Sequence, residues 1–396
     1  MKILFVHEVS YANKVVFEIH DYPELLSLRG HDVTFVDFPE GIKPTGLNRL
    51  LALRSTVVEG YSRAHTGASV RVITPGRVLA PPFDRPLASV THGPVIRGLL
   101  KSGNVDLVVL YGVPTNGWQT VRLAKRYGVP VLFRAIDVSH GIRKTRLAPL
   151  IRLAEHYIYR NADAISTHNV GLADYVVEHG ADPDTVSIEY PGLDLERFQR
   201  RPRHSGLAAE LNIAGTDRVV LFMGTLYRFA GLDPFLRLCA PWLKENPDMV
   251  VLLIGGGEEE AALRRLAADL QIESQVRITG FVDYEVLADY LSLGDVAINP
   301  FDRSEVTENA LPGKVLQYLG SGLPTVSTPL RGLMGMIGDD RSTEFAELGP
   351  AFMASVMKWV DDEEARQDAA RAARDLMERL CQWDSAIESF EAAVLR

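Results

Sequence analysis

The stretch of sequence that decides the fold lies between residues 296 and 327. It reads VAIN (296–299), then EVTENALPGKVLQYLGSG (305–322), then TVS (325–327). Two short apolar segments therefore flank a segment of helical period, which Pro312 can open and the glycines near its end can terminate. The order strand, helix, strand is typical of a parallel sheet covered by a crossover helix.

The same alternation of apolar runs and helical segments extends over almost the whole chain. Several runs are apolar without alternation, as expected of strands buried on both faces. The expected strands are 2–6, 33–36, 70–73, 107–110, 129–133, 164–167, 219–223, 250–254, 276–279, 296–299 and 325–327. Helices are expected between them, for example at 22–28, 119–127, 258–270 and 284–292. The predicted fold class is α/β.

A change in composition after Pro191 divides this alternation in two. Residues 196–217 begin basic, contain Pro and Gly and lack a long strand pattern, which predicts an interdomain connection. We therefore expect an N-terminal Rossmann-like domain over 1–195 and a C-terminal one over 218–375. Residues 376–396 are expected to form a helix that crosses back to the first domain, with an apolar stripe of Trp383, Ile387, Phe390 and Val394.

Composition excludes several classes of protein. The 396 residues are 46% hydrophobic and 23% charged, which indicates a folded chain of two or three domains. The net charge of −9 argues against nucleic acid as the partner. Two cysteines, Cys239 and Cys381, are too few for a disulfide framework or a Cys-rich zinc site. With no apolar run long enough to span a bilayer and no signal peptide, the expected location is cytoplasmic.

Ligands of parallel sheets bind beyond the carboxyl ends of the strands, so the residues that follow each strand are the candidates. Gly224, Thr225 and Arg228 follow the strand 219–223, and Gly255 opens a run of three glycines after the next strand. Glycines after the strand 219–223 allow backbone N–H groups to approach an anion closely. The acidic residues that follow the three-glycine run oppose phosphate, so packing or contact with a nucleoside is expected there. A plain turn with a solvated arginine is the alternative interpretation.

The helix that opens at Pro312 is a second candidate anion site. Its first N–H groups lack acceptors within the helix, and Lys314 lies beside them, which favours a diphosphate. Gln317, about one turn further along, can bond a sugar hydroxyl. The alternative is that Lys314 is an ordinary solvated lysine of a first helical turn.

Two groups of polar residues follow strands of the N-terminal half. Asp137 and His140 come after the strand 129–133 and are candidates for hydroxyl recognition or proton transfer. His7, Glu8 and Tyr11 follow the first strand and are candidates for binding a second substrate. Ordinary surface polarity is the alternative for both groups.

Several known catalytic motifs are absent from the sequence. It contains no H-E-x-x-H, no G-x-S-x-G and no G-x-x-x-x-G-K-[ST]. A G-x-G-x-x-G fingerprint does not follow the first strand either. These absences weigh against a zinc protease, an α/β-hydrolase, a P-loop NTPase and a dinucleotide-dependent oxidoreductase.

The ordered set of motifs resembles a retaining nucleotide-sugar glycosyltransferase of the GT-B fold, close to glycosyltransferase family 4. The segments that carry the resemblance are spread along most of the chain. They are MKILFV (1–6), LRGHDV (28–33), YRNADA (159–164), YPGLDLERF (190–198), GGG (255–257), TGFV (279–282) and residues 314–328.

The resemblance implies two Rossmann-like domains that face each other across a cleft. The C-terminal domain would bind a UDP-, GDP- or dTDP-sugar, with the base near Phe281 and Val282, and the N-terminal domain would bind the acceptor. A hexose would pass to an acceptor hydroxyl with retention, and the leaving phosphate would help to deprotonate that hydroxyl. Neither a metal nor a cofactor is implied, because helix N-termini and basic side chains neutralise the leaving diphosphate.

The chain departs from the family pattern at several positions. The family's two glutamates, seven residues apart, align with Asn309 and Gln317, and Glu308 is adjacent to the first of these. The usual diphosphate-binding Arg and Lys align with Thr225 and Ala230, which leaves the role to Arg228 or Lys314. The expected donor segment also includes Ala310, Leu311 and Gly313. The family's cleft histidine falls near Ile136, so Asp137 or His140 is the expected replacement.

Two other functions and one other partner stay open at the level of sequence. The same fold serves nucleotide-sugar 2-epimerases, and the departures also fit a non-catalytic nucleotide-sugar-binding homologue. The acceptor can be a small molecule, a glycan or a lipid-linked group. Residues 142–160 combine Arg143, Lys144, Arg146 and Arg152 with apolar residues, which fits peripheral contact with the inner membrane face or a helix packed on the core.

Overall fold

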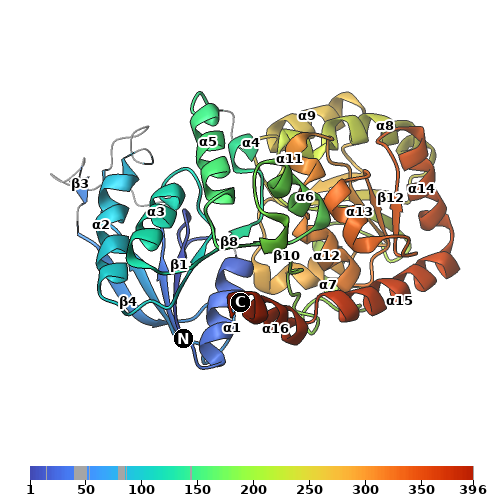
Figure 1. Cartoon of the computed structure of the whole chain (residues 1–396). Helices are drawn as coiled ribbons and strands as arrows, with labels where there is room; N and C mark the ends of the chain where they lie inside the picture. The colour runs from blue at the N-terminus through green and yellow to red at the C-terminus, as the bar shows by residue number, and fades with distance from the viewer. Residues whose placement is uncertain are drawn as a thin grey trace. The chain divides into compact units, whose positions relative to one another are not determined.

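The computed structural model describes residues 1–14, 16–39, 51–52, 54–78, 85, 87–142 and 145–395. The chain forms two compact units (Figure 1). The first unit consists of Met1–Pro191 and Asp384–Arg396, and the second consists of Gly192–Trp383. Each unit is built on its own sheet with helices packed against it, so the fold is α/β with two Rossmann-like domains, as the sequence predicted.

The first unit contains an eight-stranded sheet in the order β10-β9-β8-β7-β1-β2-β5-β4. All neighbouring strands are parallel except β4, which runs antiparallel to β5 at the edge. The strands are β1 (Lys2–Val6), β2 (Asp32–Val36), β4 (Thr56–Tyr61), β5 (Val70–Thr74), β7 (Leu107–Leu110), β8 (Val131–Ala135), β9 (Ala164–Thr167) and β10 (Val186–Ile188). The short strands β3 (Leu51–Ala52) and β6 (Arg77–Val78) pair separately. The strand order reverses direction between β1 and β7, where ligands of such sheets bind.

Helices cover both faces of this sheet. Those on one face bury their apolar sides in a common core with Leu4, Val108 and Phe133 of the strands. They are α2 (Ala88–Lys101), α3 (Gly117–Tyr127), α5 (Ala148–Tyr159) and α6 (Val170–Glu178). The short helix α4 (Ser139–Ile142) precedes α5. Because α1 (Glu18–Leu28) crosses from β1 in the opposite direction along the sheet, it lies on the other face.

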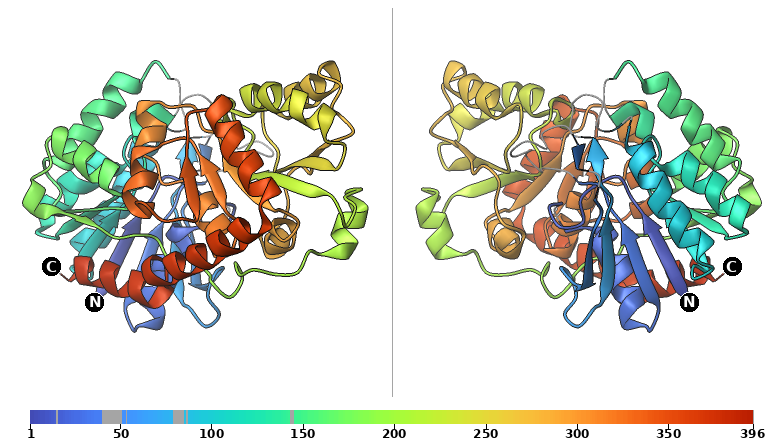
Figure 2. Two further views of the ribbon diagram at one scale, coloured as in Figure 1. Left: turned by 90° about the vertical axis from the view of Figure 1, so that its right-hand side faces the viewer. Right: turned by 90° about the vertical axis from the view of Figure 1, so that its left-hand side faces the viewer.

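The last helix, α16 (Trp383–Val394), packs against α1, as expected from its apolar stripe. The rings of Phe390 and Tyr22 stack with centroids 4.1 Å apart. At the end of α1, Glu391 forms ion pairs with Arg29 (2.8 Å) and His31 (2.7 Å). Figures 1 and 2 show the two ends of the chain next to each other in this unit.

The second unit contains a six-stranded sheet, entirely parallel, in the order β13-β12-β11-β14-β15-β16. The strands are β11 (Arg218–Met223), β12 (Met249–Ile254), β13 (Val276–Ile278), β14 (Val296–Asn299), β15 (Thr325–Ser327) and β16 (Thr343–Phe345). The helices are α7 (Ser205–Glu210), α8 (Leu232–Glu245), α9 (Glu260–Asp269), α10 (Leu287–Leu291), α11 (Glu305–Glu308), α12 (Gly313–Gly320), α13 (Arg331–Ile337), α14 (Pro350–Asp361) and α15 (Glu363–Leu380).

The boundary between the units differs from the one expected. Residues 196–217 lie within the second unit and include α7, so they are not a free connection. The expected single helix over 376–396 is instead the end of α15 followed by α16, with a break at Cys381. The break has a physical role, because the Cys381 carbonyl accepts a hydrogen bond from Leu193 N (2.7 Å). This hydrogen bond therefore joins the two segments at which the chain passes from one unit to the other. None of the described helices is long and apolar enough to cross a membrane.

Candidate functional site

Three loops meet at the carboxyl edge of the second sheet, and glycine is required where they touch. Gly224 follows β11 and Gly255 follows β12, with φ of 135° and 134°. A Cβ at Gly255 would lie 2.1 Å from the Gly224 carbonyl oxygen, so no side chain fits there. Gly255 also forms an isolated bridge with Gly280, after β13. The amides of Gly224 and Gly255 donate to Ile254 O and Thr279 Oγ1. The N–H groups of Gly224 and Gly255 therefore have acceptors within the protein, and these glycines serve close packing, which is one of the two roles expected of the three-glycine run.

Lys314 is the cation at this edge. It lies in the first turn of α12, and its Nζ is 3.9 Å from the ring centroid of Phe222 and 4.4 Å from that of Phe301. The same nitrogen lies 2.9 Å from the position of a Cβ on Gly224, so α12 and the β11 loop converge on it. Burial lowers the pKa of Lys314 to about 7. Among the described residues no carboxylate pairs with this ammonium, which is costly unless a ligand supplies the charge.

The start of α12 adds backbone donors beside this ammonium. The amide of Val315 already donates to the Pro312 carbonyl (2.8 Å), which leaves the N–H groups of Gly313 and Lys314 at the helix end. A Cβ at Gly313 would meet nothing within 4 Å, so the space in front of it is open. Gln317 lies one turn further along α12 and is half-buried. Open space, N–H groups and an unneutralised cation together suit an oxyanion.

An exposed aromatic ring flanks the same edge. Phe281 follows β13 and is 74% exposed, although large apolar side chains are usually covered. A Cβ at Gly256 would lie 3.1 Å from the Phe281 ring, so the ring lies directly beside this glycine. Val282, next to it, is half-buried. An uncovered ring at the edge of an anion site can stack against a planar heterocycle.

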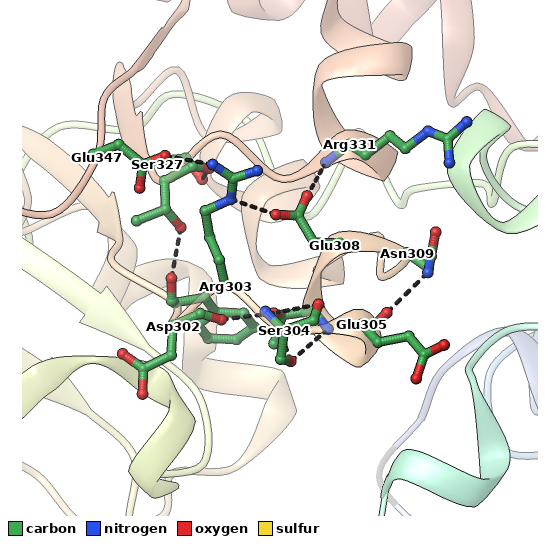
Figure 3. Close-up of polar contacts among 12 residues, drawn as sticks. Asp302, Arg303, Ser304, Glu305, Glu308, Asn309, Ser327, Arg331 and Glu347 are labelled. Carbon is green, nitrogen blue, oxygen red and sulfur yellow. Dashed lines mark hydrogen bonds and ion pairs between the residues drawn. The ribbon is translucent and has the colours of Figure 1, made fainter. Parts of the chain in front are cut away.

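Glu308 and Asn309 are adjacent in sequence but lie in different surroundings (Figure 3). The Glu308 carboxylate forms an ion pair with Arg303 Nε and accepts a hydrogen bond from Arg331 N (3.2 Å). Arg303 also pairs with Glu347. Glu308 is therefore held in a network of its own unit, and its expected catalytic role stays a prediction. The Asn309 amide donates to Glu305 O (2.8 Å).

The other residues expected to bind the donor lie in the loop after β11 and between α11 and α12. Thr225 accepts a backbone hydrogen bond from Tyr227 (2.9 Å) in the β11 loop. Arg228 begins a short 3-10 helix, Arg228–Ala230, and is exposed. Its charge acts on Asp302: burial raises the pKa of Asp302, and Arg228 lowers it. Ala310 and Leu311 lie between α11 and α12, with Leu311 buried.

In the first unit, Glu8 connects the ends of β1 and β7. Its carboxylate accepts hydrogen bonds from Thr115 N (2.5 Å), Thr115 Oγ1 (2.9 Å) and Asn116 N (3.1 Å). Burial raises the pKa of Glu8, and these hydrogen bonds oppose that effect. His7 is buried beside it and stacks on Tyr111, with ring centroids 5.1 Å apart. Both residues lie at the point where the strand order reverses.

Burial and nearby positive charge both act on His7. Burial, followed by the charges of Lys14, His20 and Arg85, lowers the pKa of His7 to about 3. Its Nδ1 accepts from Glu8 N (2.7 Å), and within the described part of the chain its Nε2 has no hydrogen-bond partner. Tyr11 is different, because it is fully buried and its hydroxyl donates to Glu24 (2.8 Å). Tyr11 belongs to the core, and its expected contact with a substrate is wrong.

Asp137 and His140 lie beyond the end of β8. Burial and the charge of Glu18 raise the pKa of Asp137 to about 7. His140 Nδ1 lies 2.6 Å from a carboxylate oxygen of Glu155, on α5, and Glu155 is fully buried. A buried carboxylate of this kind orients an imidazole and fixes its tautomer. Sequence reasoning missed Glu155, although it is the only acidic residue in α5.

A buried ionic network lies next to these residues. Arg134, on β8, is completely buried and donates to both carboxylate oxygens of Glu18, at 3.0 and 2.9 Å. It also donates to Ser166 Oγ, Thr167 O and Glu189 O. Burial raises the pKa of Glu18, but the charge and hydrogen bonds of Arg134, together with smaller contributions from His168 and Tyr111, lower this pKa overall. The sequence analysis missed this network as well.

Comparisons with known proteins show the family. The family model "Glycosyl transferases group 1" matches residues 207–376, and "Glycosyl transferase 4-like domain" matches residues 19–192. A protein named D-inositol 3-phosphate glycosyltransferase 2, from Catenulispora acidiphila, is 30% identical over 333 residues, which cover 75% of each chain. The chain belongs to the group 1 glycosyltransferases. D-inositol 3-phosphate glycosyltransferase from Streptomyces scabiei is 29% identical over 83% of this glycosyltransferase and 80% of the relative.

Solved structures have the same GT-B architecture as this glycosyltransferase. HepE from Anabaena, in complex with UDP and glucose, superposes with a TM-score of 0.73 at 15% identity, covering 100% of this chain and 99% of that chain. Sucrose-phosphate synthase from Thermosynechococcus elongatus gives a TM-score of 0.75 at 16% identity, covering 99% and 98%. At these identities the likeness is one of fold.

The glycosyltransferase therefore has two separate groups of candidate residues. At the second sheet the fold brings Lys314, Gly224 and Gly313 together, with Gly256 and Phe281 on the loops after β12 and β13. At the first sheet it places His7, Glu8, Asp137 and the His140–Glu155 pair beyond the strand ends. Among the described residues no group of three or more His, Cys, Asp or Glu side chains is placed to hold a metal ion.

Proposed function

We propose that this glycosyltransferase transfers a hexose from a nucleoside diphosphate sugar, bound at the carboxyl edge of the second sheet, to an acceptor hydroxyl with retention of configuration. The observation that carries the proposal is the Lys314 ammonium, which lies between two aromatic rings and has no carboxylate partner in the described chain. A buried cation without a counter-ion is unfavourable in the free protein, so it favours an anionic ligand.

The diphosphate is the part of the donor that suits Lys314. Its oxygens would accept from the ammonium and from the N–H groups at the start of α12, in the open space before Gly313. The same groups would stabilise the negative charge that develops on the leaving diphosphate, so the reaction needs no metal for this purpose. Arg228, exposed on the β11 loop, would be a second cation for the diphosphate.

The nucleoside would occupy the side of the site that carries Phe281. Its base would stack on the exposed ring beside Gly256 and contact Val282, and a ribose hydroxyl would bond to the Gln317 amide. Gln317 stands where the family has a glutamate, and an amide oxygen still accepts from a hydroxyl. Because HepE is described in complex with UDP, uridine diphosphate is the first nucleotide to test.

The acceptor would bind to the first unit, at the end of β1 and β8. The positive charges that act on His7, from Lys14 and Arg85, support an acceptor that carries a phosphate. The relatives are named for D-inositol 3-phosphate, so a phosphorylated polyol is the first acceptor to test. Asp137 and the His140–Glu155 pair would orient acceptor or sugar hydroxyls, while the leaving phosphate takes the acceptor proton.

Calorimetric titration with UDP tests the donor site. Lys314→Gln should weaken UDP binding roughly 10- to 100-fold, because a hydrogen bond to a charged group contributes roughly 1.5–3 kcal/mol. The matched control is Lys358→Gln, since Lys358 is an exposed lysine of the same unit that pairs with Glu344. Equal UDP affinity in the wild type and Lys314→Gln would overturn the donor site.

An assay with UDP-glucose, with and without D-inositol 3-phosphate, tests the reaction. We expect a product with an α-glycosidic bond that forms only when the acceptor is present. Conversion of the donor sugar without an acceptor would instead indicate a 2-epimerase. A nucleotide-binding protein that turns over none of a panel of UDP-, GDP- and dTDP-sugars, even by slow hydrolysis, would be a non-catalytic homologue.

A further inference from the structure

Three neighbouring helices of the first unit, α2, α3 and α5, have an unusual distribution of charge. They pack side by side on one face of the sheet (Figure 1). Although the whole chain has a net charge of −9, these helices contain a single acidic residue, Glu155. Glu155 is fully buried and bound to His140. The outer surface of the three helices, which we call the basic layer, therefore contains no acidic side chain.

The basic layer contains a groove between α2 and α3, with a volume of about 940 Å³. Its lining includes one exposed tryptophan, Trp118, which is 38% exposed. The cations in the lining are Arg97, Lys101, Arg122, Lys125 and Arg126. None of these five side chains forms an ion pair with any residue in the described ranges. They are therefore available to an anionic partner.

The behaviour of Tyr127, at the end of α3, agrees with this excess of positive charge. The hydrogen bond from Arg97 to its hydroxyl (3.3 Å) lowers the pKa of Tyr127, and the charges of Arg126 and Lys101 lower it further. On α5 the exposed Arg152 extends the positive charge. The positive charge of the groove therefore acts on a half-buried side chain at the end of α3.

Apolar side chains project from the same layer. Val90 on α2 is 64% exposed, and Leu150 and Leu153 on α5 are 62% and 65% exposed. Leu87 and Leu147, which precede these two helices, are also exposed. The inner side of α5 is different, because Ile151 and Ala154 pack toward the core of the unit. The leucines that face outward are thus not part of the core.

The geometry points to docking of the basic layer on an anionic lipid bilayer. A bilayer surface satisfies both properties at once, because lipid phosphates pair with the cations while apolar side chains and Trp118 enter the boundary between headgroups and acyl chains. Nucleic acid would neutralise the cations but leave the leucines and Val90 exposed to water. The contact is at the surface only, and it does not depend on the donor site of the second unit.

The bilayer contact extends beyond the segment that the sequence indicated. The sequence of residues 142–160 fits either membrane contact or a helix packed on the core. In the part described, α5 covers Ala148–Tyr159, and Arg143 and Lys144 lie outside the described residues. The cations that line the groove belong to α2 and α3 instead. Sequence alone did not reveal them, because they come from two helices that are separated by β7.

Co-sedimentation of the full chain with vesicles tests this inference. Binding should require phosphatidylglycerol, be absent with pure phosphatidylcholine, and decrease as salt increases. The triple variant Arg97→Gln, Arg122→Gln, Arg126→Gln should bind roughly 100-fold more weakly, since each cation contributes about fivefold. The matched control is Arg237→Gln, Arg265→Gln, Arg371→Gln, which removes three exposed cations from the second unit.

A second variant separates insertion from electrostatic attraction. Leu150→Asn with Leu153→Asn should weaken vesicle binding while its dependence on salt stays the same. UDP affinity of every variant reports that the second unit is intact, and circular dichroism reports the fold of the first. Equal vesicle binding by the triple variant and its control would overturn the inference, as would tighter binding of the basic layer to DNA or RNA than to vesicles at the same salt concentration.

Discussion

Each sheet has a cation near its carboxyl edge, but among the described residues only the cation of the first unit is paired with carboxylates of the protein. In the first unit Arg134 donates to Glu18, Ser166 and two backbone carbonyls, so its charge is compensated within the protein. In the second unit Lys314 is half-buried, with its ammonium beside two rings, and in the described chain it has no carboxylate partner. The comparison distinguishes a cation whose charge is compensated within its unit from a cation whose charge we expect a bound ligand to compensate.

Removal of the compensated cation should have the largest effect. Arg134→Met leaves the carboxylates of Glu18 and Glu189 buried without their partner, which should cost about 3–5 kcal/mol of unfolding free energy. Hydrogen exchange measured by mass spectrometry on peptides of the first unit reports this loss without interference from the second unit.

The matched variant in the other unit is Lys314→Met. It removes a buried ammonium and leaves no carboxylate behind, so the exchange protection of the second unit should stay the same or increase. Equal loss of protection in both variants would contradict the distinction between the two cations.

The next largest effect should be the dependence of donor affinity on pH. The pKa of Lys314 is lowered to about 7 in the free protein, and a bound diphosphate favours the charged form and raises it again. Affinity for UDP-glucose should therefore be nearly constant below pH 7 and fall by about tenfold per pH unit above it. Isothermal titration calorimetry in buffers of different ionisation enthalpy should detect proton uptake above pH 7.

The control for this pH dependence is Lys314→Gln. Its affinity should be low and nearly independent of pH between 6 and 9, because it lacks the titrating ammonium. A decrease in wild-type affinity that persists in the variant would assign the titration to another group.

The smallest effect should come from Glu308. Its carboxylate is tied to Arg303 and to the amide of Arg331, and Arg303 is half-exposed. Because exposed ion pairs contribute little, Glu308→Gln should change the unfolding free energy by less than about 1 kcal/mol and kcat/KM by less than about threefold. A loss of about 100-fold in kcat with unchanged UDP affinity would restore the catalytic role that the sequence suggested.

Most of the fold follows from short apolar runs, because strands buried on both faces must be apolar throughout. The runs 2–6, 107–110 and 164–167 match β1, β7 and β9 residue for residue. The strands that were missed lack this pattern. β4 is an exposed antiparallel edge strand, and β10 and β16 have only three residues each.

The candidate site was partly predictable. Lys314 was predicted because it follows a proline and a glycine at the start of a helix. The N–H groups of a helix start and an adjacent lysine favour an oxyanion in any fold. Arg134 was missed because the strand was expected to cover 129–133. In the structure β8 runs from Val131 to Ala135, since Pro130 has no N–H to donate to a neighbouring strand. A charged residue inside an apolar strand was the available signal.

Long-range placement could not be predicted from these patterns. The partner of Arg134, Glu18, lies in the first turn of α1, which begins four residues before the expected start. The stacking of Phe281 beside Gly256 likewise joins residues that belong to different loops. Periodicity specifies which face of an element is buried, but not which other element supplies its polar partners.

The position of α16 has a consequence for how the protein is made. Phe390 covers Tyr22, and Glu391 neutralises Arg29, so the first unit needs residues that are translated after the whole second unit. During synthesis the residues up to Trp383 leave the ribosome earlier, and the unit that they complete can fold while the N-terminal one still waits for its closing segment. A nascent chain arrested before this segment should therefore remain a chaperone client at its N-terminal half alone.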